Sequence, residues 1–342
     1  LWADMVLRHP DHMAEFPREA VFCDWLYSQT REHDSSLHVW GIGSVNAERY
    51  NTIPAETRQR YEKYWRLGAS DFPNHFYQFP YTPFLRDNGF DVWTGPSTLY
   101  AANSVCGPRL PAARASGREW LKAARRFGAL GALNTCWAVR GALRECTLAG
   151  HKAFLMNGKA QGLDDARVAR ACCDWAGDDA PKVAEAIDGL NACVDMFSLA
   201  APMSFDAASR AHRLVGYATR FDAARFRLAE LTADDPQVAD HQAALDRAAR
   251  AEAALAPLAP RHEQAQAWLL SARESSLRAQ LWLAAWRRAR GGPPARDTRL
   301  AARLFQHAAD MEAFMKDRYL PGDVAVLRHD RYETSLALLR HL

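Results

Sequence analysis

Residues 20–25 have the sequence AVFCDW, a short apolar run that ends in an aspartate and a tryptophan. The pattern returns in FDVW at residues 90–93 and in GALNTCW at residues 131–137. Short apolar runs flanked by turn residues are typical of parallel strands that are covered on both faces. Sequential strands joined by right-handed crossovers usually lie side by side, so we expect these three stretches to be neighbouring strands of one parallel sheet.

Segments of helical character separate the predicted strands. Residues 112–127 are amphipathic and long enough for a crossover helix, and Gly128 is placed to end it. Residues 72–88 are expected to form a second crossover, which three prolines interrupt. Strands that alternate with helices predict an α/β fold for residues 1–162, either a barrel or a doubly wound sheet.

From about residue 163 the composition shifts to alanine, arginine, leucine and aspartate, with few glycines. Apolar positions recur there at helical spacing, at Val183, Ile187, Leu190, Val194 and Phe197 and at Trp268, Ala272, Ser275, Ala279, Trp282 and Trp286. We expect residues 163–342 to form an all-α C-terminal domain, with a helix start at Ser204 and Asp206 and a break at residues 291–294. The face with Trp282 and Trp286 should be buried, either against the helices of the first domain or in a partner, which could be a second copy of the chain.

The composition limits the partners and the location of the protein. A net charge of +3 over 342 residues offers no electrostatic basis for binding nucleic acid or an anionic membrane. The seven cysteines are odd in number and contain no C-x-x-C pair, which favours free thiols in a reducing, cytoplasmic compartment. The sequence begins at Leu1 and not at a methionine, which leaves open a targeting segment upstream.

Other familiar motifs are incomplete. The glycine-rich turn at residues 41–44 lacks the third glycine and the following helix of a phosphate-binding loop, so we expect no cofactor. His9 and His12 could share a metal by their spacing, but no third ligand is near them in the sequence, and we expect surface histidines. The pairs Asp164-Asp165 and Asp178-Asp179 are expected to begin helices.

A tryptophan ends each predicted strand, at Trp25, Trp93 and Trp137, and Trp2 is placed to end one more. In α/β barrels the ligand site lies at the C-terminal ends of the strands. Tryptophans there would provide flat apolar walls for pyranose rings, whose hydroxyls could be bound by Asp4, Asn103 and Arg140. The alternative is that these tryptophans fill the core, as most large aromatic side chains do.

Four segments carry a resemblance to a known family: LWADM at residues 1–5 with His9-Pro10, residues 16–27, residues 84–95, and residues 120–140. In this order they resemble the second half of glycoside hydrolase family 20-type barrels, nearest to the hexosaminidase D-like branch. The resemblance implies that residues 1–162 are the C-terminal portion of a (β/α)8 TIM-type barrel, and that the complete protein hydrolyses terminal β-linked N-acetylhexosamine. It places on the wall of the sugar pocket Trp2, Asp4, Trp25, Tyr27, Trp93 and Trp137, with Arg140 near the rim.

The chain also departs from this family. The W-D-D-M segment appears as Trp2-Ala3-Asp4-Met5, and residues 147–152 replace a segment containing proline and tryptophan. In the family, an adjacent Asp-Glu pair ends the fourth strand. Its Glu protonates the leaving oxygen and its Asp orients the 2-acetamido nucleophile, an exception to the usual two-carboxylate scheme. No Asp-Glu dipeptide occurs in this sequence, so we expect the pair upstream of Leu1, no catalytic residue in the chain and no hydrolysis by the chain alone.

Two other functions stay open. A non-catalytic homologue could keep the aromatic cleft and bind carbohydrate, and sugar affinity without turnover in the complete protein would indicate it. Alternatively, residues 163–342 could be a helical interaction module for which the first half is only a platform. Capture of a partner by those residues alone would favour that function.

Overall fold

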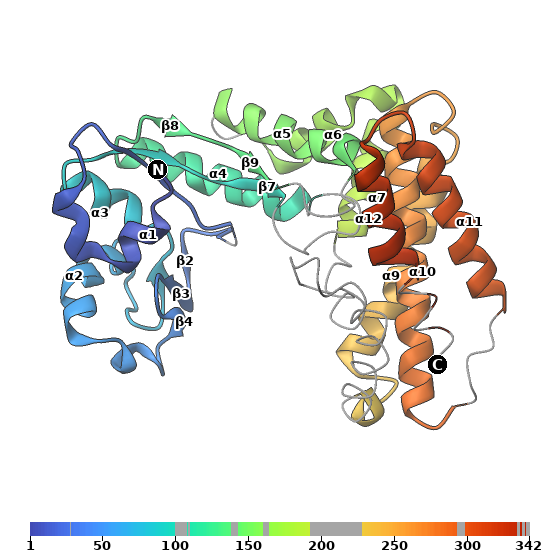
Figure 1. Cartoon of the computed structure of the whole chain (residues 1–342), viewed down its shortest axis with the longest axis horizontal. Coiled ribbons are helices and arrows are strands. Elements are labelled where there is room, and N and C mark those ends of the chain that lie inside the picture. The colour runs from blue at the N-terminus through green and yellow to red at the C-terminus, as the bar shows by residue number, and fades with distance from the viewer. Residues whose placement is uncertain are drawn as a thin grey trace. The chain divides into compact units, whose positions relative to one another are not determined.

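The computed structural model describes residues 1–27, 29–99, 108, 110–137, 143–159, 164–191, 228–292, 298–333, 336 and 339. Contacts between residues divide the chain into two units (Figure 1). The sheet unit comprises Leu1–Thr98, Pro111–Cys136 and His151–Leu163, and the helical unit comprises Leu99–Leu110, Trp137–Gly150 and Asp164–Leu342. Each unit has a hydrophobic core of its own.

Three parallel strands form the centre of the sheet unit, β1 (Val21–Asp24), β6 (Asp91–Thr94) and β8 (Gly131–Ala132), in the order β1-β6-β8. Cys23 pairs with Trp93, and Trp93 pairs with Gly131. Trp2 makes a parallel bridge to Cys23. The prediction of three neighbouring parallel strands is therefore confirmed, and Trp2 lies in parallel pairing as the prediction of a further strand end requires.

The strands are shorter than the apolar runs that predicted them. β6 ends at Thr94, and pairing resumes beyond Pro96 in a separate two-stranded sheet of β7 (Ser97–Leu99) and β9 (Thr135–Cys136). The carbonyl of Pro96 accepts the N–H of Thr135 at 2.8 Å, but proline has no N–H with which to continue the ladder. The strand predicted at residues 131–137 is accordingly divided into β8 and β9.

Short helices and one hairpin connect β1 to β6. The first residues form α1 (Asp4–Arg8) and η1 (Pro10–Glu15) before β1. After β1, β3 (Ser36–Val39) and β4 (Gly43–Asn46) form an antiparallel hairpin, and η2 (Tyr50–Thr52) and α2 (Ala55–Trp65) follow it.

Residues 72–88 do not form the single interrupted crossover that the sequence predicts. They contain β5 (Phe76–Tyr77), which pairs antiparallel with β2 (His33–Asp34), and then α3 (Tyr81–Asp87). Pro80 immediately precedes α3, where the missing N–H of proline costs no helical hydrogen bond. The chain therefore uses this proline to start a helix and not to break one.

The second crossover matches its prediction. α4 (Leu110–Arg126) begins two residues before the expected range 112–127 and ends one residue before its end. Gly128 lies two residues after α4 with a φ of +63°, a conformation that favours glycine. After β9 the chain forms α5 (Arg144–Lys159).

The two faces of the parallel sheet differ. Side chains alternate along a strand, so Phe22 and Asp24 of β1 share one face with Val92 and Thr94 of β6. All four are at most 1 % exposed, and α3 packs on both strands. Trp93 points to the other face and is 39 % exposed. The sheet unit thus has one covered face and one face that carries an exposed tryptophan.

The helical unit contains α6 (Asp165–Cys172), η3 (Asp174–Asp179), α7 (Ala180–Asn191), α9 (Pro236–Leu255), α10 (Glu263–Ala289), α11 (Thr298–Met315), α12 (Pro321–Leu327) and η6 (Arg328–Glu333). The described residues from 164 onward include no strand, as the sequence predicts. The Asp164 carboxylate accepts the Ala166 N–H at 3.2 Å and caps α6, whereas Asp178 and Asp179 end η3 directly before α7. The predicted positions Val194, Phe197, Ser204 and Asp206 lie outside the described residues.

Trp282 and Trp286 are buried, as predicted, but within their own unit. The His241 ring of α9 stacks on the Trp282 ring at 3.7 Å, and the Trp286 indole N–H donates to the carbonyl of Leu231 at 3.0 Å. α9 can lie this close to α10 because it presents alanines, and Ala244, Ala248 and Ala251 are fully buried. Neither the first domain nor a partner is therefore needed to cover these two tryptophans. None of the described helices is long and apolar enough to span a membrane.

Candidate functional site

Four aromatic side chains meet where β1 ends, and we call them the Trp25 cluster. The Trp25 ring lies 6.3 Å from Trp2, 4.8 Å from Tyr27 and 4.9 Å from Trp40, measured between ring centroids. Trp40 is 8 % exposed, Trp25 and Tyr27 are half-buried, and Trp2 is 40 % exposed. The cluster therefore combines a buried base with an accessible aromatic surface.

One carboxylate orients the central ring of the cluster. Asp4, the first residue of α1, accepts the Trp25 indole N–H on Oδ1 at 3.2 Å. Its other oxygen, Oδ2, accepts no hydrogen bond from the described residues, and the side chain is half-buried. Asp4 can thus hold Trp25 in place and still accept a hydrogen bond from a ligand hydroxyl.

Three residues of this neighbourhood were missed by the sequence predictions. Trp40 and His38 come from the β3–β4 hairpin, with their rings 4.8 Å apart, and the Arg8 guanidinium of α1 lies 5.7 Å from the Trp40 ring. Burial and the positive charge of Arg8 lower the pKa of His38, which favours a neutral imidazole. The signal was present in SLHVW at residues 36–40, where Leu37 and Val39 alternate with His38 and Trp40 ahead of a glycine turn.

Trp93 lies on the open face of the parallel sheet, but it is not the last residue of its strand. It pairs with Cys23, two residues before Trp25, and β6 continues to Thr94. The prediction that Trp93 ends its strand is therefore wrong by one residue, because β6 ends at Thr94. Its ring lies over Gly131, where a Cβ atom would be 2.6 Å from Trp93 Cζ3. Glycine at position 131 leaves the space that the indole occupies.

The remaining predicted site residues are not brought to the Trp25 cluster by the described contacts. Trp137 follows β9, belongs to the helical unit and is 46 % exposed. Asn103 and Arg140 lie outside the described residues. Among the predicted site residues, the described contacts therefore join Trp2, Asp4, Trp25 and Tyr27.

Asp24 is a buried carboxyl group that the sequence predictions did not assign to a site. It is 1 % exposed, its Oδ2 accepts the Thr82 hydroxyl at 2.6 Å, and its Oδ1 has no hydrogen bond. Burial raises the pKa of Asp24 to about 7, and the hydrogen bond from Thr82 only partly opposes this. Because Asp24 faces α3, the sheet separates it from Trp93 on the open face.

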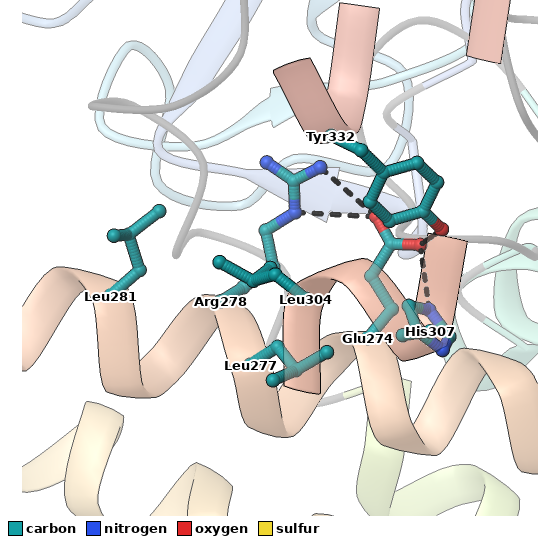
Figure 2. A pocket seen from close by; sticks show the side chains of 7 residues that line it. All are labelled: Glu274, Leu277, Arg278, Leu281, Leu304, His307 and Tyr332. Carbon is teal, nitrogen blue, oxygen red and sulfur yellow. Dashed lines mark hydrogen bonds and ion pairs between the residues drawn. The ribbon is translucent and has the colours of Figure 1, made fainter. Parts of the chain in front are cut away.

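A second polar cluster lies in the core of the helical unit (Figure 2). Glu274 of α10 accepts hydrogen bonds from Arg278 Nε at 3.2 Å, from Arg278 Nη2 at 3.0 Å and from the Tyr332 hydroxyl at 3.0 Å. His307 Nε2 of α11 lies 3.5 Å from the same carboxylate without a hydrogen bond. The space between these side chains is too small for a water molecule. We interpret this Glu274 cluster as a structural ion pair of the core.

We searched the described part of the chain for clusters of side chains that bind metal ions. It contains no group of three or more histidine, cysteine, aspartate or glutamate side chains that could hold an ion. His12 pairs with Glu15 at 2.7 Å at the surface.

Comparison with known proteins does not assign the chain to a family. No protein-family model, no curated protein and no solved structure matches it. A proposal for its function therefore rests on its own residues and on the order of its motifs.

Proposed function

We propose that the chain is a glycoside hydrolase-like protein of the β-N-acetylhexosaminidase type, and that the Trp25 cluster holds the ring of a terminal N-acetylhexosamine. The observation that carries this proposal is the hydrogen bond from the Trp25 indole to Asp4, beside the exposed Trp2 ring at the end of a parallel strand. An aromatic wall with one oriented carboxylate suits a ligand that has an apolar face and a hydroxyl edge.

The same proposal extends the parallel sheet to a barrel. The three described strands would be the C-terminal portion of a (β/α)8 barrel, and the face with Trp93 would be its interior. Two features support this assignment: helices connect the parallel strands, and α3 covers the opposite face of β1 and β6. In such a barrel the Trp25 cluster would lie at the C-terminal edge, where ligands bind.

The described residues around the cluster supply binding groups and no acid pair. Asp4 is engaged with Trp25, and Asp24 lies on the covered face of the sheet. A positioned general acid contributes typically about 10²–10⁴-fold to the rate, and neighbouring-group attack needs a held acetamide. We therefore propose sugar binding without turnover for this chain, with hydrolysis reserved for a protein that also contains the Asp-Glu pair. A non-catalytic carbohydrate-binding protein is the second candidate that this observation favours.

Binding is tested by ligand-observed NMR with an aryl β-N-acetylglucosaminide. Trp25→Phe keeps a ring but removes the indole N–H, and Asp4→Asn removes the carboxylate charge. We expect both to weaken binding, by about tenfold or more for a central binding residue. Trp175→Phe in the helical unit is the matched control and should bind as the wild type does. Equal affinity in all four proteins would refute the proposed site.

Hydrolysis is tested on the purified chain with a chromogenic aryl β-N-acetylglucosaminide. We expect no release of the aryl alcohol above the uncatalysed rate. Turnover that Trp137→Ala abolishes would place a catalytic acid within these 342 residues and would overturn our assignment of the chain as binding only.

A further inference from the structure

Arg8 brings a positive charge to the Trp25 cluster. It is the last residue of α1, one helical turn after Asp4, and side chains four residues apart are neighbours on a helix surface. The Asp4 carboxylate accepts the Trp25 indole N–H, and the Arg8 guanidinium lies 5.7 Å from the centre of the Trp40 ring. The aromatic rings are therefore flanked by one acidic and one basic side chain of the same helix.

The charge of Arg8 has no counter-charge among the residues that the structure describes. Every other arginine described in the sheet unit forms an ion pair or a hydrogen bond, whereas the Arg8 guanidinium has only the Trp40 ring as a described partner. Arg18 is the best comparison, because its guanidinium also lies over a ring, that of Phe90 at 5.3 Å, yet it donates to the Asn88 carbonyl at 2.8 Å. An aromatic ring attracts a cation without using its N–H donors, so the Arg8 guanidinium can still bind an anion.

The side chains next to Arg8 offer further donors. The Trp40 indole N–H is buried, and no described residue accepts a hydrogen bond from it. Buried donors normally have an acceptor, so an acceptor is missing beside this ring. The His38 ring lies 4.8 Å from the Trp40 ring, and its nitrogens form no hydrogen bond with a described residue. Its pKa is lowered by burial and by the charge of Arg8, which favours a neutral ring with one N–H donor.

We propose that Arg8 and His38 bind the acidic group of an anionic sugar, a carboxylate or a sulfate carried by an N-acetylhexosamine. This inference rests on the proposed function, because the Trp25 cluster would hold the ring of the same sugar. A hydroxyl of that ring would face the second oxygen of Asp4, and the acidic group would lie one helical turn away, at Arg8. As Arg8 turns from the Trp40 ring toward the anion, the indole N–H can become a third donor. Charge-assisted hydrogen bonds are about twice as strong as neutral ones, so the acidic group should raise the affinity.

The probes are N-acetylglucosamine, its 6-sulfate and N-acetylmuramic acid, which carries a carboxylate. Their binding to the full chain is measured by isothermal titration calorimetry at low and at high salt. We expect an acidic derivative to bind at least about tenfold more tightly than the neutral sugar at low salt, and to lose this advantage at high salt. The derivative that binds more tightly identifies the acidic group as a sulfate or a carboxylate. Equal affinity for all three sugars would overturn this inference and leave the neutral sugar site standing.

Variants test the two proposed anion ligands. Arg8→Met removes the charge and keeps an apolar side chain beside Trp40, and it should fold because Arg8 is exposed. It should bind the acidic sugar at least about tenfold more weakly and the neutral sugar as the wild type does. His38→Phe keeps a ring without nitrogen donors and should also weaken binding of the acidic sugar. Arg18→Met is the matched control and should change neither affinity. Unchanged binding of the acidic sugar to Arg8→Met would overturn the proposal.

Trp25→Phe separates this inference from the proposed function. If both are right, Trp25→Phe weakens binding of the neutral and of the acidic sugar. If the acidic sugar binds Trp25→Phe as it binds the wild type, but binds Arg8→Met more weakly, the anion site is supported and the proposed sugar site is refuted. If the neutral sugar binds more weakly to Trp25→Phe while the acidic group brings no gain in affinity, the sugar site is supported and the anion site is refuted.

Discussion

The core of the helical unit and the open face of the parallel sheet use tryptophan differently, although the sheet unit also buries Trp65 and Trp120 in its own core. In the helical unit Trp268, Trp282 and Trp286 are between 1 % and 9 % exposed and fill the core. In the sheet unit Trp2 and Trp93 are 40 % and 39 % exposed, although each takes part in strand pairing. A tryptophan that the sequence pattern places on a helix or strand is therefore either buried or exposed. Which of the two it is depends on whether another element covers that face of the helix or sheet.

Buried carboxyl groups show the same contrast. Asp24 of the sheet unit has one neutral donor, Thr82, and burial raises the pKa of Asp24 to about 7. Glu274 of the helical unit accepts two hydrogen bonds from the Arg278 guanidinium and one from Tyr332. A charged partner can keep a buried carboxylate ionised. Beside a neutral partner, protonation of the carboxylate costs less free energy than burial of its charge. This comparison makes four predictions.

The largest effect is expected for Glu274→Gln. This change removes the carboxylate charge that pairs with the buried Arg278 guanidinium, and breaking a buried ion pair typically costs about 3–5 kcal/mol of unfolding free energy. The measurement is urea unfolding of the full chain followed by far-UV circular dichroism. Glu263→Gln is the control, because Glu263 is exposed, its partner Arg318 is only half-buried, and surface pairs contribute about 1 kcal/mol or less. Equal losses of unfolding free energy in Glu274→Gln and Glu263→Gln would mean that the buried pair contributes no more to stability than the surface pair.

The second prediction concerns pH and Asp24→Asn. The pKa of Asp24 rises from 3.8 in the unfolded chain to about 7 in the folded chain, so between these values the folded state binds more protons. The contribution of protonated Asp24 to the free energy of unfolding is therefore fully present below about pH 4. It is lost as the pH rises to about 7. At about 1.4 kcal/mol per pKa unit, the stability of the wild type relative to Asp24→Asn should fall by roughly 4 kcal/mol. Urea unfolding of both proteins at a series of pH values measures this, and a difference independent of pH would contradict it.

A smaller effect is expected for Gly131→Ala on the open face of the sheet. The new Cβ atom would lie 2.6 Å from Trp93 Cζ3, so the indole must leave its position. Overpacking of this kind typically costs about 1–3 kcal/mol. Unfolding free energies and the emission maximum of tryptophan fluorescence report the cost and the movement. An unchanged emission maximum together with unchanged stability would show that Trp93 does not rest on Gly131.

The smallest predicted effect is a gain in stability, for Gly189→Ala. Gly189 lies inside α7, and a Cβ atom there would meet no atom within 4 Å. Alanine should therefore stabilise the helical unit by about 0.5–1 kcal/mol, since it loses less backbone entropy than glycine on folding. Thermal unfolding compares Gly189→Ala with Gly131→Ala. Destabilisation by both would show that the two glycines have similar surroundings.

Local patterns were sufficient for much of the architecture. The runs ending at Trp25 and Trp93 predicted parallel strands because apolar runs of that length fit a covered sheet. The helical spacing of Trp282 and Trp286 predicted their burial because residues three and four apart share a helix face. Residues 72–88 were predicted wrongly because the pairing of β5 with the distant β2 cannot be read from local sequence.

The sequence by itself determined the parallel strands, the helical second half and an aromatic, tryptophan-rich first half. Only the tertiary structure decided which of these side chains meet. The hydrogen bond from Trp25 to Asp4 spans 21 positions, and the hydrogen bond from Arg126 to Glu32 spans 94. Such pairs depend on how separate elements pack, and no periodicity within one segment encodes that packing. The raised pKa of Asp24 has the same origin, because desolvation is a property of the folded surroundings and not of the residue.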